Sequence, residues 1–224
     1  MLHWKTVSGQ LKEYLLVLMA AKELAEFRLV GGTALSLHLG HRMSVDIDLF
    51  TDAEYGTLDF EVIEAFLKAS FPYVSGDFGG AEIIGKSYLI GSDEDHMVKL
   101  DIYYSMDPFF QDAVVIDNVR LASVEEIIAM KVDVVQRGGR KKDFWDLHQV
   151  LDDYDLIAMI DLHAKRFEWT HERDVILENF TDFSAADADF DPICLMAKEW
   201  VFIKEDFEAA KVAMNEPETD EAKA

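Results

Sequence analysis

Apolar residues recur at helical spacing over residues 10–27, which predicts an amphipathic helix there. A short apolar strand over 28–30 runs into a glycine pair, and a second helix is predicted to follow it as far as Leu39, with Thr33 as its N-cap. Residues 44–50 then alternate between polar and apolar side chains, as a half-buried strand does. The N-terminal segment is therefore predicted to fold as helix, strand, helix, strand.

The middle of the chain combines one more helical pattern with strand patterns. Residues 60–71 carry apolar side chains on one side of a helix, which Pro72 ends. Two strands, 81–90 and 96–104, are separated by a polar turn and predict a hairpin. Residues 114–121 predict one further strand.

From residue 123 onward the pattern is helical. Ser123 and Glu126 match a capping box, so a helix is predicted to begin at Val124 and to end at Gly138-Gly139. Another helix is predicted over 142–151, and the pattern stays helical to about 214. The sequence thus predicts an α+β fold, in which a mixed sheet with flanking helices precedes a helical C-terminal region.

The change in composition sets the predicted domain boundaries. We expect an α/β domain over 1–122 and a helical domain over 123–214. The last segment, 215–224, concentrates acidic residues beside a proline and is expected to be a disordered tail.

Charge and composition exclude several classes of protein. The formal net charge of −23 argues against a broad nucleic-acid surface, although a local basic strip or a basic protein partner remains compatible with it. No apolar run reaches the ~18 residues of a membrane span. The single cysteine, Cys194, excludes an intrachain disulfide and a cysteine-based zinc site. We expect a cytoplasmic protein with no membrane partner.

Two carboxylates within the strand over 44–50 are the first candidate for chemistry. Asp46 and Asp48 are two residues apart, so they project from one face of a strand. Like charges this close need a cation between them, and a divalent metal fits that need. Gly31 and Gly32 leave backbone N–H groups accessible to a phosphate at a helix N-terminus. A bare Asp-x-Asp more often marks a polar turn, but the apolar neighbours favour the metal.

Asp101 is the third candidate carboxylate. It lies in the apolar strand over 96–104, where Lys99 and Tyr103 share its face. If this strand neighbours the first pair, three carboxylates can hold two Mg²⁺ ions, with Mn²⁺ as a substitute. In that case we expect Asp101 to accept the proton of the acceptor hydroxyl. The structural alternative is an ion pair of Asp101 with Lys99 or Arg120.

Positive residues form a second group of candidates. Arg42 precedes the carboxylate pair and is suited to bidentate phosphate binding, or else is a surface residue. Lys131 lies among apolar residues of its helix and needs an anion, either a triphosphate or a nearby carboxylate such as Glu126 or Asp133. A basic cluster follows it, suited to a nucleotide, an RNA backbone, or merely a solvated turn at the C-terminus of the helix (Arg137, Arg140, Lys141 and Lys142).

Other catalytic signatures are absent from the sequence. No histidine pair has the spacing of a zinc enzyme, no Gly-x-Ser-x-Gly elbow occurs, and no Walker lysine loop is present. Acyl hydrolases and P-loop NTPases are therefore excluded.

These motifs together resemble the AbiEii/AbiGii-type nucleotidyltransferase toxins of the polymerase-β-like superfamily. The likeness spans about residues 28–151. It begins with Gly31-Gly32-Thr33-Ala34-Leu35 and Arg42-x-Ser44-x-Asp46-Ile47-Asp48-Leu49-Phe50, and it continues with Asp101, Lys131, Arg137 and Lys142-Asp143-Phe144-Trp145-Asp146-Leu147.

The resemblance implies transfer of a nucleotide from an NTP to a hydroxyl, with tRNA as a candidate acceptor and a separate antitoxin as partner. It implies that Asp46, Asp48 and Asp101 hold the metals, that Lys131 contacts phosphates and that Asp143 is the late acidic residue. The nucleotide-binding residues would be Gly31, Gly32, Thr33, Arg42, Ser44, Lys131, Arg137, Lys142 and Asp143. The alternatives are an inactive binding module of the same fold and a nucleotidyltransferase of small molecules.

Overall fold

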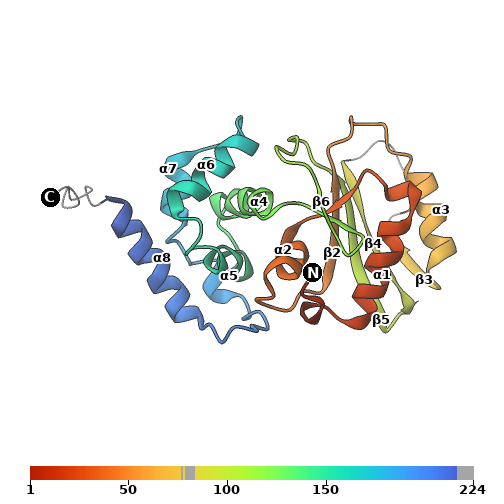
Figure 1. Ribbon diagram of the computed structural model, residues 1–224, viewed down its shortest axis with the longest axis horizontal. Helices are drawn as coiled ribbons and strands as arrows, with labels where there is room; N and C mark the ends of the chain where they lie inside the picture. The colour runs from red at the N-terminus through yellow and green to blue at the C-terminus, as the bar shows by residue number, and fades with distance from the viewer. Residues whose placement is uncertain (77, 79–83, 216–224) are drawn as a thin grey trace. The chain divides into compact units, whose positions relative to one another are not determined.

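The computed structural model describes residues 1–76, 78 and 84–215, and the chain divides into two compact units, Met1–Ile127 and Ile128–Ala224 (Figure 1). The predicted boundary near residue 122 lies just before this division. The predicted acidic tail lies outside the described residues apart from Asn215, and so do the first three residues of the predicted strand over 81–90. Within the described ranges, no helix is both long enough and apolar enough to cross a membrane.

The first unit contains a mixed seven-stranded sheet in the order β3-β4-β5-β2-β1-β7-β6. Strands β2 and β5 are parallel, as are β1 and β7, whereas the other neighbours are antiparallel. This sheet and its helices confirm the predicted α+β class. The strands are β1 (Arg28–Leu29), β2 (Asp46–Thr51), β3 (Tyr73–Gly76), β4 (Gly85–Asp93), β5 (His96–Tyr104), β6 (Val114–Ile116) and β7 (Val119–Leu121).

Three helices accompany the sheet: α1 (Gly9–Ala20), α2 (Gly31–Leu39) and α3 (Phe60–Ser70). Helix α1 is shorter than predicted, because Ala21 is extended (φ −74°, ψ 132°) and the chain continues as a 3₁₀ turn over Lys22–Leu24. Helix α2 ends at Gly40, which takes the left-handed conformation (φ 73°) expected of a C-terminal glycine.

The strand alternation separates a buried face of the sheet from a partly exposed one. Ile47, Leu49, Leu100 and Ile102 are fully buried. Helices α1 and α3 cover this face side by side (Figure 1), and the Tyr14 and Phe71 rings meet edge to face where they adjoin. The intervening residues of β2 and β5 lie on the opposite face, which carries the candidate carboxylates.

The predicted single strand over 114–121 is instead a hairpin of β6 and β7. Its two turn residues, Asp117 and Asn118, have positive φ values (52° and 64°), as a two-residue type I′ turn requires. Asp and Asn tolerate this conformation better than other residues with a Cβ, but they signal it less strongly than Asn-Gly does.

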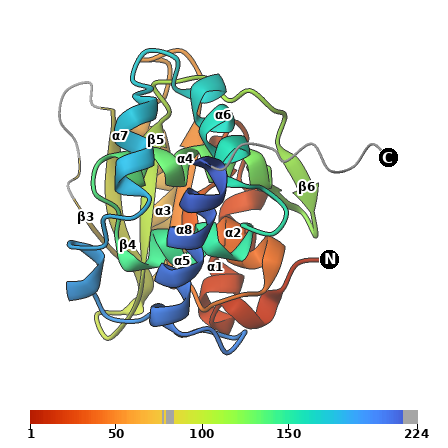
Figure 2. The same cartoon turned by 90° about the vertical axis from the view of Figure 1, so that its left-hand side faces the viewer.

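The second unit is helical (Figure 2). The described helices that build it are α4 (Val124–Gln136, which begins in the first unit), α5 (Lys141–Gln149), α6 (Leu156–Arg166), α7 (Arg173–Asn179) and α8 (Trp200–Asn215). The Ser123 hydroxyl accepts a hydrogen bond from Glu126 N (3.2 Å), as predicted for the start of α4. Phe207 of α8 packs against Phe144 of α5 and Phe180, so aromatic burial holds these helices together.

Histidines in partly buried positions predict a loss of stability in mild acid. Burial is the largest cause that lowers the pKa of His38, His148 and His171 from 6.5. The unfolded chain therefore binds more protons than the folded one just below pH 6.5, so the free energy of unfolding falls as the pH decreases through that range. Urea unfolding should give a lower midpoint at about pH 5.5 than at about pH 7.5. A midpoint that stays constant or rises would contradict this assignment.

Candidate active site

Parallel pairing of β2 and β5 brings the three candidate carboxylates onto one face of the sheet. Asp48 lies directly opposite Asp101 in the register, and Asp46 lies opposite Lys99. Asp46 and Asp48 are both half-buried, with buried Ile47 between them on the other face, as the alternation predicts. From the sequence, the three carboxylates were expected to meet only if the two strands were neighbours, and the register shows that they are.

Lys99 provides a positive charge within this group. Its Nζ lies 2.5 Å from Asp101 Oδ2. The hydrogen bond to Asp101 is the largest cause that raises the pKa of Lys99; partial burial opposes it, and the charges of Asp101, Asp48 and Asp46 reinforce it. The other oxygen of this carboxylate, Asp101 Oδ1, is buried and accepts no hydrogen bond from any described residue. Asp101 therefore retains a buried acceptor that a cation would satisfy.

The glycine pair places the start of α2 against the carboxylates. Gly31 is the first residue of α2 and has a φ of +68°, a conformation that favours glycine. A Cβ at this position would lie 2.8 Å from Asp48 Oδ2. The preceding residue, Val30, donates its N–H to the Asp48 carbonyl (2.9 Å), which fixes the helix start to β2. The absence of a side chain at Gly31 is therefore what lets the helix N-terminus approach Asp48.

Replacing Gly31 with alanine should disturb both the fold and the site. We expect Gly31→Ala to lower the free energy of unfolding by about 1–2 kcal/mol, the cost of a left-handed L-residue, and to displace the Asp48 carboxylate. Urea unfolding measures the first effect and Mn²⁺ affinity the second. Gly9→Ala is the matched control, since a Cβ there meets nothing within 4 Å, and it should cause no loss. Equal behaviour of the two variants would contradict the proposed role of Gly31.

Thr33 and Ser44 connect α2 to the segment that enters β2. Thr33 was predicted to be the N-cap of α2, but Val30 occupies that position and Thr33 lies within the first turn. The Thr33 hydroxyl instead donates to the Asp46 carbonyl (2.5 Å) and lies 2.8 Å from Ser44 Oγ. Both side chains are buried. Their hydrogen bonds position β2. A contact of Thr33 and Ser44 with the nucleotide stays a prediction.

Arg42 is buried, in contrast to the surface alternative considered for it. Its Nη1 donates to the Met43 carbonyl (3.0 Å), and a Cβ on Gly32 would clash with its Nη2. The guanidinium therefore packs against the backbone at the N-terminus of α2, where no side chain caps the helix. A guanidinium and a helix N-terminus together provide a positive environment suited to an anion.

Two observations indicate that these residues suit a divalent cation. Asp101 Oδ1 is buried and has no donor among the described residues, and the Lys99 ammonium already lies against the Asp101 carboxylate. As the side chains stand, however, no three His, Cys, Asp or Glu residues in the described part of the chain form a ready metal site. Asp101 is turned toward Lys99 instead. Binding a metal there would require Asp101 to exchange partners.

Lys131 and Asp143 meet in the second unit, within a buried ion cluster. Lys131 Nζ contacts Asp143 Oδ1 (2.6 Å) and Asp146 Oδ2 (2.8 Å), and both aspartates are fully buried. Burial on its own would raise the pKa of Asp143, but the Lys131 charge and the hydrogen bonds from Arg140 and Lys131 bring that pKa below its usual value. These two anions come from α5, and neither was among the carboxylates that the sequence suggested for Lys131.

The basic cluster is largely neutralised by neighbouring carboxylates. Arg137 pairs with Asp133 (2.5 Å), Arg140 with Asp143 (2.9 Å) and Lys141 with Asp191 (3.0 Å). Lys142 and Arg140 line a small cavity of about 260 Å³ with Asp189, Phe190 and Pro192. The predicted strip of positive charge is therefore less positive than the sequence indicates.

Sequence reasoning named Lys99 only as an alternative ion-pair partner of Asp101, which the structure confirms, and it gave no site role to Phe50 or Tyr103. Phe50 lies opposite Tyr103 in the register, one step beyond Asp48 and Asp101, and the two ring centroids are 5.8 Å apart. An aromatic surface thus adjoins the carboxylates. The two-residue alternation that identified Asp46 and Asp48 would have identified these neighbours as well.

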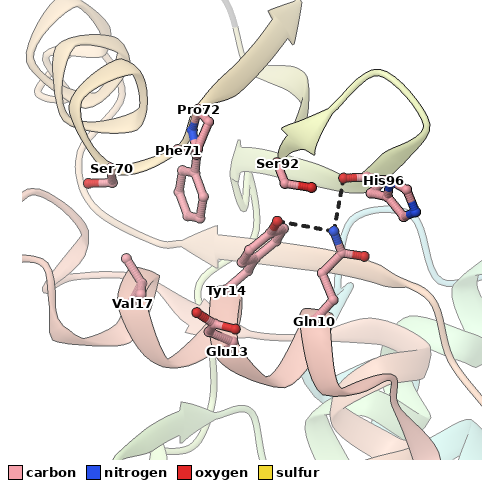
Figure 3. A pocket seen from close by; sticks show the side chains of 9 residues that line it. All are labelled: Gln10, Glu13, Tyr14, Val17, Ser70, Phe71, Pro72, Ser92 and His96. Carbon is pink, nitrogen blue, oxygen red and sulfur yellow. Dashed lines mark hydrogen bonds between the residues drawn. The ribbon is translucent and has the colours of Figure 1, made fainter.

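A separate pocket of about 520 Å³ lies between α1, the end of α3 and the β4–β5 turn (Figure 3). Within it, Gln10 Nε2 donates to the Tyr14 hydroxyl (3.0 Å) and to the His96 carbonyl (2.9 Å). None of the three carboxylates lines this pocket. It therefore does not belong to the candidate active site.

Comparisons with known proteins agree with this fold. Residues 14–224 match the family described as "Nucleotidyl transferase AbiEii toxin, Type IV TA system". MenT4, a nucleotidyltransferase toxin from Mycobacterium tuberculosis H37Rv, aligns with a TM-score of 0.58 at 14% identity, over 90% of this chain and 82% of its own. JHP933 from Helicobacter pylori aligns with a TM-score of 0.57 at 18% identity, over 91% of this chain and 88% of its own. At these identities the structural likeness shows the fold alone. No curated protein matches the sequence.

Proposed function

This chain belongs to the AbiEii family of nucleotidyltransferase toxins, and from that premise we propose that it transfers a nucleotide from an NTP to an acceptor hydroxyl in a reaction that depends on a divalent metal. The first acceptor to test is the 3′ end of tRNA. The observation that carries the proposal is the register that pairs Asp48 with Asp101 on one sheet face, with Asp46 two residues away.

The three carboxylates have distinct parts in this proposal. Asp46, Asp48 and Asp101 would hold Mg²⁺, up to two ions, with Mn²⁺ as a substitute. The bound metal would supply charge stabilisation for the pyrophosphate that leaves and lower the pKa of the acceptor hydroxyl. Asp101 would receive the acceptor proton, because it would need to bind only the metal on the acceptor side.

The start of α2 would bind the triphosphate. The uncapped helix N-terminus at Gly31 and Gly32 offers backbone N–H groups, and Arg42 adds a guanidinium beside Gly32. Thr33 and Ser44 would hold the start of α2 to the segment that enters β2, through their mutual hydrogen bond. Lys131, Arg137, Lys142 and Asp143 also remain proposed nucleotide-binding residues.

Incubation with each labelled NTP, Mg²⁺ and total tRNA tests the proposal. We expect one NTP to label tRNA in the presence of Mg²⁺. EDTA should abolish the labelling, because without a bound metal the negative carboxylates would repel the negative triphosphate. Tight NTP binding by calorimetry without any product, across many acceptors, would contradict transfer and favour a binding module.

Membership in a type IV toxin–antitoxin family implies nucleotide substrates and a cognate antitoxin. The net charge of −23 suits a basic partner. We propose that a small basic protein encoded beside this chain is the antitoxin.

A small hydroxylated molecule is the second candidate acceptor. It is favoured by the ion pairs that neutralise Arg137, Arg140 and Lys141, since an RNA backbone needs uncompensated positive charge. Mass spectrometry of the products separates the two: added nucleotide mass on tRNA supports the first candidate, and on a small molecule the second.

A further inference from the structure

Lys99 lies among the three carboxylates, and the proposed function gives it no part. Its Nζ contacts Asp101 Oδ2 at 2.5 Å, and it stands opposite Asp46 in the parallel ladder of β2 and β5. Its side chain is 48% exposed, whereas that of Asp101 is only 17% exposed. A flexible lysine stem that reaches in from solvent therefore brings its charge to a largely buried carboxylate.

Lys99 brings a positive charge to a sheet face that carries three carboxylates. Asp46, Asp48 and Asp101 lie on this face, and the Lys99 ammonium contacts Asp101. Repulsion among the carboxylates would favour a further cation in the same place. The ammonium and a divalent cation cannot both lie against Asp101 without strong mutual repulsion, because little solvent separates them there.

Because Asp101 is largely buried, its carboxylate needs one of these two cations as a partner. Asp101 Oδ1 is buried and has no donor among the described residues, so Oδ2 carries the ion pair with Lys99. If Lys99 swings into solvent, the carboxylate loses that pair and must find another positive partner. Lysine is suited to such exchange, since its ammonium is a compact charge on a flexible stem that hydrates readily.

We propose that Lys99 is an internal counter-cation, which holds the carboxylates together in the metal-free protein and must leave Asp101 before a divalent cation binds. Lys99 thereby sets the metal affinity of the active site. This inference rests on the proposed function, because it takes the same carboxylates as the metal ligands.

Calorimetric titration of the full chain with Mn²⁺, without nucleotide, tests the inference. Lys99→Met keeps most of the length of the side chain and removes its charge, and we expect it to bind Mn²⁺ at least about tenfold more tightly than the parent. Lys99→Arg retains the charge and should bind like the parent. Lys22→Met makes the same change of net charge at a side chain that is 91% exposed, so it should also bind like the parent.

The outcomes separate this inference from the proposed function. Tighter binding by Lys99→Met, or binding seen in it alone, supports the counter-cation. Equal or weaker binding by Lys99→Met, with Asp48→Asn abolishing the binding of the parent, overturns the role of Lys99 and leaves the proposed function in place. No saturable Mn²⁺ binding by either protein overturns both. Thermal unfolding monitored by circular dichroism verifies that each variant is folded.

Discussion

Asp48→Asn should lower the rate of nucleotidyl transfer by roughly a thousandfold, the scale seen when one preorganised electrostatic group is removed from an active site. Asp48 lies opposite Asp101 in the ladder and against the backbone of Gly31, so it joins the candidate metal ligands to the start of α2. An amide of nearly the same shape keeps this packing and removes the charge. Label transfer from NTP under saturating Mg²⁺ measures the effect.

Stability separates loss of chemistry from loss of fold in this variant. The amide keeps the shape of the side chain, so Asp48→Asn should remain folded and unfold in urea in one cooperative transition. Asp95→Asn, an equal change of charge in the exposed β4–β5 turn, should transfer label like the parent. Full activity of Asp48→Asn would show that the carboxylate is not part of the reaction.

Lys131→Met should destabilise the protein by about 3–5 kcal/mol, the usual cost of removing one partner of a buried ion pair. Both carboxylates that contact Lys131 Nζ, those of Asp143 and Asp146, are fully buried. Without the ammonium, Asp143 keeps Arg140 as a partner, but both buried carboxylates lose a charge-assisted contact. Urea unfolding measures the loss of free energy, and Lys22→Met, at an exposed site, should leave the midpoint unchanged.

A compensated variant distinguishes two roles of Lys131. Replacing Asp143 and Asp146 with asparagine in the Lys131→Met background removes the buried charges together, so more than half of the lost stability should return. If label transfer returns with it, the cluster only holds α4 to α5. If stability returns without transfer, Lys131 or its partners also contact the nucleotide. Undiminished stability of Lys131→Met itself would contradict the buried ion cluster.

Local patterns predicted the parts of the site that depend on neighbouring residues. Asp46 and Asp48 share a face because side chains of a strand alternate with period two, and the sequence carries that information directly. The end of α2 at Gly40 likewise follows from a local preference. The α+β class follows from such local patterns summed along the chain.

Contacts between distant segments could not be derived in this way. That Asp101 lies beside Asp48 depends on parallel pairing of β2 with β5, which no local pattern specifies. The sequence suggested nearby anions for Lys131, but the fold supplies Asp143 and Asp146 from the following helix. Thr33 was assigned as a cap by residue type, whereas its hydroxyl bonds with the entry to β2 instead.

The central claim is that Asp46, Asp48 and Asp101 form one site for a divalent cation. Titration with Mn²⁺, comparing the parent with Asp101→Asn, tests it most directly. We predict saturable binding by the parent and by Asp95→Asn, and at least about tenfold weaker binding by Asp101→Asn, because a carboxylate ligand is lost. Equal affinities of Asp101→Asn and the parent would show that Asp101 does not bind the cation and would contradict the account.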